Sequence, residues 1–138
     1  MTQPDADAPP VRRIHVSAAV IHDDHGRLLL VRKRGTTSFM QPGGKPEPGE
    51  SAGETLRREL SEEIGVRVEE SALTALGTFS AAAANEPGHV VVADVFHVEL
   101  SGQVASAAAE IDEVRWVTRS DADGLDVAPL AREYFLPD

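Results

Sequence analysis

The sequence contains no cysteine. This absence excludes a disulfide framework, a Cys-ligated zinc or iron–sulfur site and thiol catalysis, and it fits a reducing compartment. Basic residues are also few, because 13 Lys and Arg stand against 23 Asp and Glu, which gives a formal net charge of −10. This charge is opposite to that of a nonspecific nucleic-acid binder. If the ligand is a polyanion, a bound cation must mediate its binding.

Long apolar runs are absent as well. No run approaches the roughly 18 residues needed to span a bilayer, so we expect no membrane contact. Residues 1–10, MTQPDADAPP, lack the basic and apolar regions of a secretory signal, and they predict a disordered lead-in to a cytoplasmic protein. Residues 11–138 have the length of one domain with a single core.

β-rich segments alternate with turn signals along most of the chain. Residues 11–34 predict a hairpin, because IHVSAAVIH and RLLLVRKR flank the turn DDHG. Further strands are predicted for VRVEE (66–70), ALGTFSAAAA (75–84), HVVVADVFHVEL (89–100) and EVRWVT (113–118). The run Ala81–Ala84 has helical propensity, but its flanking strands favour a strand or irregular structure. APLAREYFL (128–136) predicts a terminal amphipathic helix.

The main helix is predicted to begin after Ser51 and to end at Gly65. Ser51 and Glu54 have the spacing of a capping box, and glycine is a common helix stop. An apolar stripe with a spacing of four residues should face the core: Ala52, Leu56, Leu60 and Ile64. Three carboxylates, Glu59, Glu62 and Glu63, fall within an arc of roughly 100° bordering that stripe. Their mutual repulsion and the helix dipole both disfavour this placement, so another interaction must stabilise it.

The same segment carries a pattern with rigid spacing. Gly44 is followed after five residues by Glu50 and after seven more by Arg58-Glu59-Leu60, and then by Glu62-Glu63 and Gly65-Val66. In this pattern Gly44 to Val66 resembles the complete signature of the Nudix hydrolase family, which includes MutT-like proteins. The resemblance in the order of elements extends over roughly residues 12 to 136.

This resemblance implies an α/β fold, an α/β/α sandwich with a mixed β-sheet, and an enzyme that hydrolyses phosphoric anhydride bonds. It implies Mg²⁺ as cofactor, with Mn²⁺ as a substitute, and all-oxygen donors suit both ions. The implied metal ligands are the Gly44 carbonyl and the side chains of Glu59, Glu62 and Glu63. Glu50 would support the site, and Arg58 would orient the carboxylates. Such a cation would neutralise the carboxylate repulsion, bridge phosphate oxygens and activate water.

Several roles remain open between two interpretations. The group that takes the proton from water is either Glu59 or Glu110; the latter resembles a later glutamate used by other members, although EIDE also reads as a solvated acidic loop. Lys45 either contacts a phosphate or is an exposed surface lysine. Phe39 and Phe79 either stack on a base or sugar of the substrate or belong to the core.

The favoured function is a divalent-cation-dependent pyrophosphohydrolase acting on a nucleoside diphosphate linked to another group. The substrate could be a modified nucleoside triphosphate, a nucleotide sugar or a dinucleoside polyphosphate. The alternative is a catalytically silent nucleotide-sensing module, although the complete carboxylate set favours catalysis. Isopentenyl diphosphate isomerisation would need a cysteine, and messenger-RNA decapping would need a basic surface. A homodimer is consistent with the family. Ala81–Ala84 and Asn85 either line the substrate pocket or pack closely against a neighbour.

Overall fold

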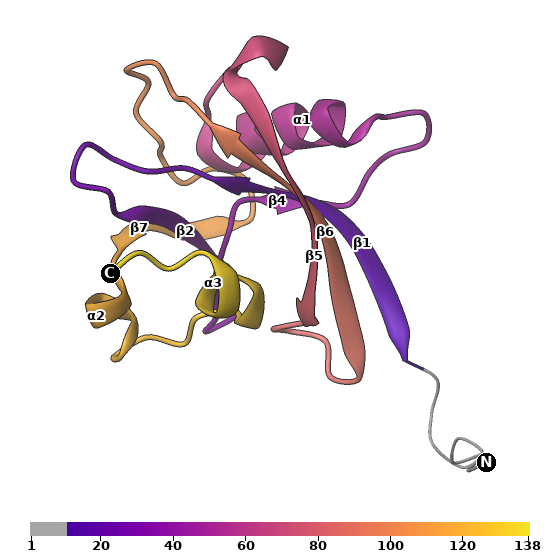
Figure 1. Cartoon of the computed structure of the whole chain (residues 1–138), viewed down its shortest axis with the longest axis vertical. Coiled ribbons are helices and arrows are strands. Elements are labelled where there is room, and N and C mark those ends of the chain that lie inside the picture. Colours follow the sequence, from indigo (N-terminus) through magenta and orange to yellow (C-terminus); the bar gives the residue numbers. More distant parts are fainter. Residues whose placement is uncertain (1–10) are drawn as a thin grey trace.

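The computed structural model describes residues 11–138, so the predicted lead-in at residues 1–10 lies outside the described part. Figure 1 shows α1 on one side of the strands and α2 and α3 on the other, which gives the sandwich predicted from the resemblance. The elements in chain order are β1 (Arg12–Val20), β2 (Leu28–Lys33), β3 (Phe39–Met40), β4 (Gly43–Gly44), α1 (Ala52–Ile64), the 3₁₀ turn η1 (Glu70–Ala72), β5 (Leu73–Ala82), β6 (His89–Val98), β7 (Ile111–Val117), α2 (Arg119–Ala122) and α3 (Pro129–Tyr134).

The strands form two sheets between the helices. One has four strands in the order β4-β1-β6-β5, and its β1–β6 pair is parallel while the other pairs are antiparallel. The other has three antiparallel strands in the order β3-β2-β7. The mixed pairing predicted for the sheet is therefore confirmed, although the strands are divided between two sheets.

The predicted hairpin at residues 11–34 is wrong in its pairing. The turn itself forms, because the Asp23 carboxylate accepts hydrogen bonds from the backbone N–H groups of His25 and Arg27, at 2.9 and 2.8 Å. Beyond a single bridge between His22 and Leu28, however, β1 and β2 separate into different sheets. Both edges of β1 are taken by β4 and β6, so β2 pairs with β3 and β7 instead.

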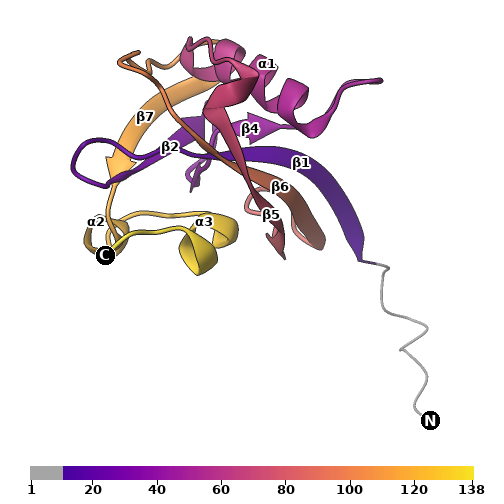
Figure 2. The same ribbon diagram turned by 45° about the horizontal axis from the view of Figure 1, so that its top comes forward.

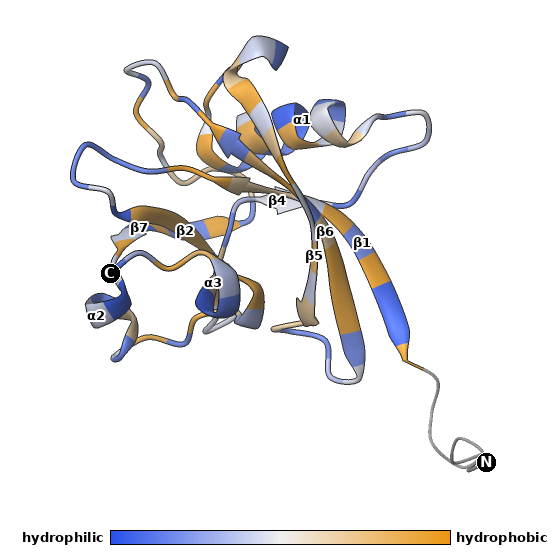
Figure 3. Cartoon of the chain, viewed as in Figure 1, coloured by the Kyte–Doolittle hydropathy of each residue, from blue (hydrophilic) through white to orange (hydrophobic). Residues whose placement is uncertain are grey.

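The turned view in Figure 2 shows the strands between α1 on one side and α2 and α3 on the other. Two clusters of buried apolar side chains form the core. Successive residues of a strand point to opposite faces. Leu28 and Leu30 accordingly join the core beneath α3, while Leu29 and Val31 join the core beneath α1, and all four are at most 1% exposed. Figure 3 shows the resulting apolar colouring of β2 between the two helical layers. This double burial explains why LLLV is a continuous apolar run.

Helix α1 forms as its sequence predicts. The Ser51 hydroxyl accepts from the Glu54 backbone N–H at 3.1 Å, and the Glu54 carboxylate accepts from the Ser51 N–H at 3.0 Å. Gly65 ends the helix in the left-handed region, with φ of 69°. Leu56, Leu60 and Ile64 are fully buried. This packing fixes the rotation of α1 and so decides which face its glutamates occupy.

The strand predicted at residues 66–70 is also wrong. Val66 and Val68 are buried, as strand-like alternation suggests, but no neighbouring strand pairs with them. Side chains take that place: Gln103 bonds to the N–H and the carbonyl of Arg67, at 2.8 and 2.6 Å, and Arg57 donates to the Val68 carbonyl at 2.8 Å. These backbone N–H and carbonyl groups are therefore hydrogen-bonded by side chains and not by a neighbouring strand.

The C-terminal part contains one helix more than predicted. Short helix α2 precedes α3 and is capped by Thr118, whose hydroxyl accepts from the Asp121 N–H at 3.2 Å. The sequence signal for this helix was the T-x-x-D spacing of Thr118 and Asp121, which form a capping box. None of the helices within residues 11–138 combines the length and apolarity required to cross a bilayer.

Candidate active site

Strand β4 brings its two glycines against the glutamates of α1. Gly43 and Gly44 pair with Ala18 and Ser17 of β1. The Gly43 backbone N–H donates to the Glu63 carboxylate at 2.9 Å. A Cβ atom added to Gly44 would lie 2.5 Å from Cδ of Glu59, so this carboxyl group rests directly against the glycine. Gly44, Glu59 and Glu63 are therefore neighbours in space.

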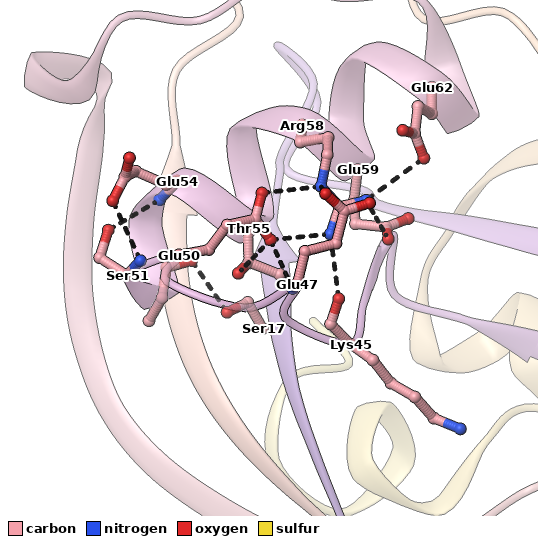
Figure 4. A network of polar contacts seen from close by, with 11 residues as sticks. Ser17, Lys45, Glu47, Glu50, Ser51, Glu54, Thr55, Arg58, Glu59 and Glu62 are labelled. Atoms are coloured by element: carbon pink, nitrogen blue, oxygen red, sulfur yellow. Dashed lines mark hydrogen bonds and ion pairs between the residues drawn. The ribbon is translucent and has the colours of Figure 1, made fainter.

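Arg58 connects the loop before α1 to the carboxylates of α1 (Figure 4). Its Nε and Nη2 donate to the two carboxylate oxygens of Glu50, at 2.8 and 3.0 Å. Its Nη1 donates to Glu59 at 2.9 Å and to Glu62 at 3.4 Å. Nη2 also donates to the Lys45 carbonyl at 3.0 Å. One guanidinium thereby holds the loop and two of the predicted metal ligands together.

These contacts divide the glutamates into two electrostatic classes. Hydrogen bonds from Arg58 lower the pKa of Glu50 to about 2, which keeps it ionised. Burial instead raises the pKa of Glu63 to about 7, and the charge of nearby Glu59 adds to this rise. Burial also raises the pKa of Glu59, against the opposing effect of Arg58. Ionisation of Glu59 and Glu63 therefore costs free energy in the folded protein, and a nearby cation would reduce this cost.

A cavity of about 710 Å³ opens beside this cluster. Glu59, Arg58, Gly44 and Lys45 line one part of it. The remaining wall comes largely from aliphatic side chains of β1, β6 and α3, including Ile14, Val16, Val91, Leu130 and Ala131. Ala82, Ala83, Ala84 and Asn85 also line it, which agrees with the pocket role considered for the alanine run. The cavity thus joins a charged end to an apolar end.

Glu110 lies at the charged end of the cavity, and the end of α1 anchors its loop. The backbone N–H groups of Ser106 and Ala108 donate to the carbonyls of Ile64 and Glu63, each at 3.0 Å. These bonds satisfy carbonyls that a helix end leaves unpaired. The Glu110 carboxylate lies 3.5 Å from Nζ of Lys33, and both residues line the cavity. The structure therefore brings Glu110 to the same cavity as Glu59.

The basic residues Arg32, Lys33 and Arg34, at and just after the end of β2, lie in two different places. Lys33 lines the cavity, whereas the Arg32 and Arg34 guanidinium groups lie within 3.8 Å of Asp112 carboxylate oxygens. Lys45 also lines the cavity. Of the basic residues at the end of β2 and in the β4–α1 loop, Lys33 and Lys45 therefore line the cavity, whereas Arg32 and Arg34 do not.

The two phenylalanines, Phe39 and Phe79, which were left open between a substrate contact and a core residue, lie away from the cavity lining. Phe39 is 5% exposed, belongs to the core beneath α3 and stacks under the Arg115 guanidinium at 5.1 Å. Phe79 packs against Tyr134 and Phe135, with ring centroids 5.1 and 5.0 Å apart. Neither residue lines the cavity. The structure favours the core interpretation for both.

Two buried polar residues at the site were not predicted. Thr55 is 0% exposed, and its hydroxyl donates to Glu50 at 3.1 Å. Gln41 lines the cavity, and its Nε2 donates to the Ala19 carbonyl at 3.0 Å. Its Oε1 is the one buried side-chain N or O atom without a partner within residues 11–138. The sequence signal for Thr55 was a polar residue on the side of α1 that carries the apolar stripe. No sequence pattern marked Gln41.

Comparison with known proteins identifies the family. The model of the NUDIX domain matches residues 11–138. The chain belongs to the Nudix family. A MutT-like protein of Streptomyces ambofaciens is 34% identical over 119 residues, which cover 86% of this chain and 72% of that protein. The MutT protein of Methanosarcina mazei Go1 has a similar structure, with a TM-score of 0.72 and 25% identity, covering 93% of this chain and 94% of that chain.

Named Nudix relatives indicate the class of reaction. The 8-oxo-dGTP diphosphatase of Haemophilus influenzae is 39% identical over 57 residues, which cover only 38% of this chain and 42% of that enzyme. The Nudix domain together with such relatives supports a Nudix hydrolase enzyme. Its reaction class therefore agrees with the expectation from the signature.

The donor set of this Nudix site fits a hard divalent cation. Carboxylate and carbonyl oxygens are the preferred ligands of Mg²⁺, and the burial of Glu59 and Glu63 next to Gly44 leaves negative charge to be neutralised. Within residues 11–138, no three Asp, Glu or His side chains converge as a ready metal cage. Glu59 and Glu62 contact Arg58 instead, and Glu63 accepts from Gly43.

Proposed function

We propose that this protein is a pyrophosphohydrolase that depends on Mg²⁺ or Mn²⁺ and cleaves a nucleoside diphosphate linked to another group. The observation that carries the proposal is the set of three carboxylates on α1, Glu59, Glu62 and Glu63, which contact Arg58 or Gly43, with Glu59 lining the cavity. A diphosphate fits the charged end, and the organic group fits the aliphatic end.

The residues that would hold the cation are Glu59, Glu62, Glu63 and the Gly44 carbonyl. When bound, the cation supplies charge neutralisation for the phosphate oxygens and polarises phosphorus. Glu50 would keep its two bonds with Arg58 and hold in place the guanidinium that contacts Glu59 and Glu62. Lys33 and Lys45 line the cavity and would attract the substrate phosphates.

The reaction forms one bond and breaks another. The oxygen of water bonds to one phosphorus of the diphosphate, and the bond from that phosphorus to the bridging oxygen breaks. A carboxylate that lines the cavity takes the proton from water, and both candidates for this role, Glu59 and Glu110, line the cavity. Glu110 is the more accessible of the two, since its side chain is 62% exposed and that of Glu59 is 14% exposed.

The substrate is to be found among modified nucleoside triphosphates, nucleotide sugars and dinucleoside polyphosphates. The named diphosphatase relative that acts on 8-oxo-dGTP supports testing oxidised nucleoside triphosphates first. The wild-type protein should be incubated with Mg²⁺ or Mn²⁺ and a panel of all three classes, with products identified by mass. We expect cleavage at the diphosphate of one class, with kcat/KM above about 10⁴ M⁻¹s⁻¹.

Two variants make the test specific to the site. The double substitution Glu62→Gln, Glu63→Gln should abolish turnover, and Glu133→Gln should retain it, since Glu133 is exposed and does not line the cavity. The variants Glu59→Gln and Glu110→Gln distinguish the two proton acceptors by the loss of the acidic limb of the kcat–pH profile, because a general base must be deprotonated to act. Tight nucleotide binding with no turnover of any substrate would refute hydrolysis and favour a sensing module.

A further inference from the structure

Thr55 places a hydroxyl group on the buried side of α1, next to the fully buried Leu56. A buried hydroxyl group costs free energy unless it is hydrogen-bonded. Threonine in a helix often bonds back to the carbonyl four residues earlier. Here the hydroxyl donates to the Glu50 carboxylate at 3.1 Å instead, as Figure 4 shows. Its polar group is therefore directed to the site rather than to the helix backbone.

Glu50 is the acceptor that links Thr55 to Arg58. One of its oxygens accepts from the Thr55 hydroxyl, from the Glu47 backbone N–H at 2.7 Å and from Nη2 of Arg58 at 3.0 Å. The other accepts from Nε of Arg58 at 2.8 Å. Glu47 belongs to the same loop as Glu50, and Arg58 has a long flexible side chain. Thr55, by contrast, is fully buried and has a β-branched side chain with restricted rotation.

We propose that Thr55 is a positioning residue for hydrolysis, which fixes the Glu50 carboxylate and through it the Arg58 guanidinium that contacts Glu59 and Glu62. This inference rests on the proposed function. The hydroxyl of Thr55 sets the orientation of the carboxylate, the carboxylate sets the plane of the guanidinium through two parallel bonds, and the guanidinium holds two metal-ligand side chains near their working positions.

Three substitutions separate positioning from packing. Thr55→Val keeps the shape of the side chain and removes the hydroxyl, Thr55→Ser keeps the hydroxyl and removes the methyl, and Thr55→Ala removes both. Each purified variant should be titrated with Mn²⁺ in the absence of substrate, and kcat and KM should be measured on the substrate found by the panel. Melting temperatures report whether each variant folds.

We expect Thr55→Val to lose about 10-fold in Mn²⁺ affinity and in kcat, near the lower end of the range for groups that orient metal ligands. KM should change less, because substrate contacts are intact. Thr55→Ser should restore both quantities toward wild type, although its missing methyl lowers the melting temperature.

The opposite ranking would overturn the proposal. If Thr55→Val binds Mn²⁺ and turns over like wild type while Thr55→Ser and Thr55→Ala are impaired, Thr55 serves packing alone and the hydrolase assignment is unaffected. If wild-type protein hydrolyses nothing, the proposed function fails. The Mn²⁺ titration then decides the role of Thr55 separately: equal Mn²⁺ affinity of Thr55→Val and wild type would overturn the positioning role, and a loss restored by Thr55→Ser would support it.

Discussion

Replacing Gly43 with alanine tests the contact of β4 with β1 that positions the site. A Cβ atom at Gly43 would overlap the Ser17 carbonyl oxygen and would lie 2.9 Å from Cα of Ala18. Both neighbours are backbone of β1, so neither can rotate away. The φ of Gly43, 152°, is also one that alanine rarely adopts. The substitution must therefore separate β4 from β1 or distort both strands.

The magnitude follows from these two costs. Overpacking against backbone costs about 1–3 kcal/mol, the unfavourable φ costs about 1–3 kcal/mol, and the smaller conformational entropy of unfolded alanine offsets about 0.4–1 kcal/mol. We therefore expect a loss of about 3 kcal/mol in the free energy of unfolding, or about 10 °C in melting temperature for a domain of this size. Separation of β4 also weakens the bond from Gly43 to Glu63.

Two other glycines supply matched controls. Gly26 has a φ of 76° and no atom within 4 Å of an added Cβ, so Gly26→Ala isolates the dihedral cost, about 1–2 kcal/mol. The three atoms nearest an added Cβ at Gly44 all belong to the carboxyl group of Glu59, the end of a flexible side chain. We expect Gly44→Ala to remain folded, with a loss of under about 1 kcal/mol, but to lose about 10-fold or more in Mn²⁺ affinity and kcat.

Thermal and urea unfolding of the three variants, with Mn²⁺ titration and kinetics, complete the comparison. If Gly43→Ala is no less stable than Gly26→Ala, the close approach of β4 to β1 is refuted. If Gly44→Ala binds Mn²⁺ and turns over normally, the contact between Glu59 and Gly44 is not part of the working site.

Three further changes test the electrostatics and the loop that follows α1. Arg58→Lys should lower kcat about 10-fold or more, because an ammonium group lacks the planar fork that binds Glu50; unchanged kinetics would contradict this. Because the folded state raises the pKa of Glu63 from 4.5 to about 7, stability in EDTA should fall as pH rises through that interval, by about 3 kcal/mol. Urea unfolding at several pH values between 4.5 and 7 measures this slope, and Glu63→Gln should remove it. Gln103→Ala should cost about 0.5–1.5 kcal/mol and expose the amide of Arg67 to hydrogen exchange; unchanged protection there would refute the bridging role of Gln103.

Local sequence signals predicted the α1 region well for physical reasons. The capping box of Ser51 and Glu54 and the glycine stop at Gly65 act within a few residues, so their partners are visible in the sequence. The buried stripe of α1 then fixes the helix rotation, and the positions of Glu59 and Glu63 follow from it. The family resemblance added the expected sandwich, which the fold confirms.

Signals that depend on distant partners were the ones that failed. Residues 11–34 do contain two strands, but β1 does not pair with β2, because β4 and β6 occupy the two edges of β1. The turn sequence between the strands carries no information about these distant partners. Alternation at Val66 and Val68 is equally real, yet Gln103, 36 residues after Arg67, supplies the hydrogen bonds of a neighbouring strand. Phe39 is apolar beside a signature loop, and only its contacts assign it to the core.

The crowding of carboxylates near the end of α1 is explained by three partial compensations. Arg58 neutralises Glu59 and Glu62 from the same helix, and the Gly43 N–H partly satisfies Glu63. These contacts leave the pKa of Glu63 raised to about 7, so the compensation is incomplete without a cation. A divalent ion that binds ionised Glu59 and Glu63 must therefore stabilise the folded protein as well as the phosphates of the substrate. Residual stabilisation by Mg²⁺ in the Glu62→Gln, Glu63→Gln variant would show that the ion binds elsewhere, whereas its loss together with turnover assigns both effects to one site.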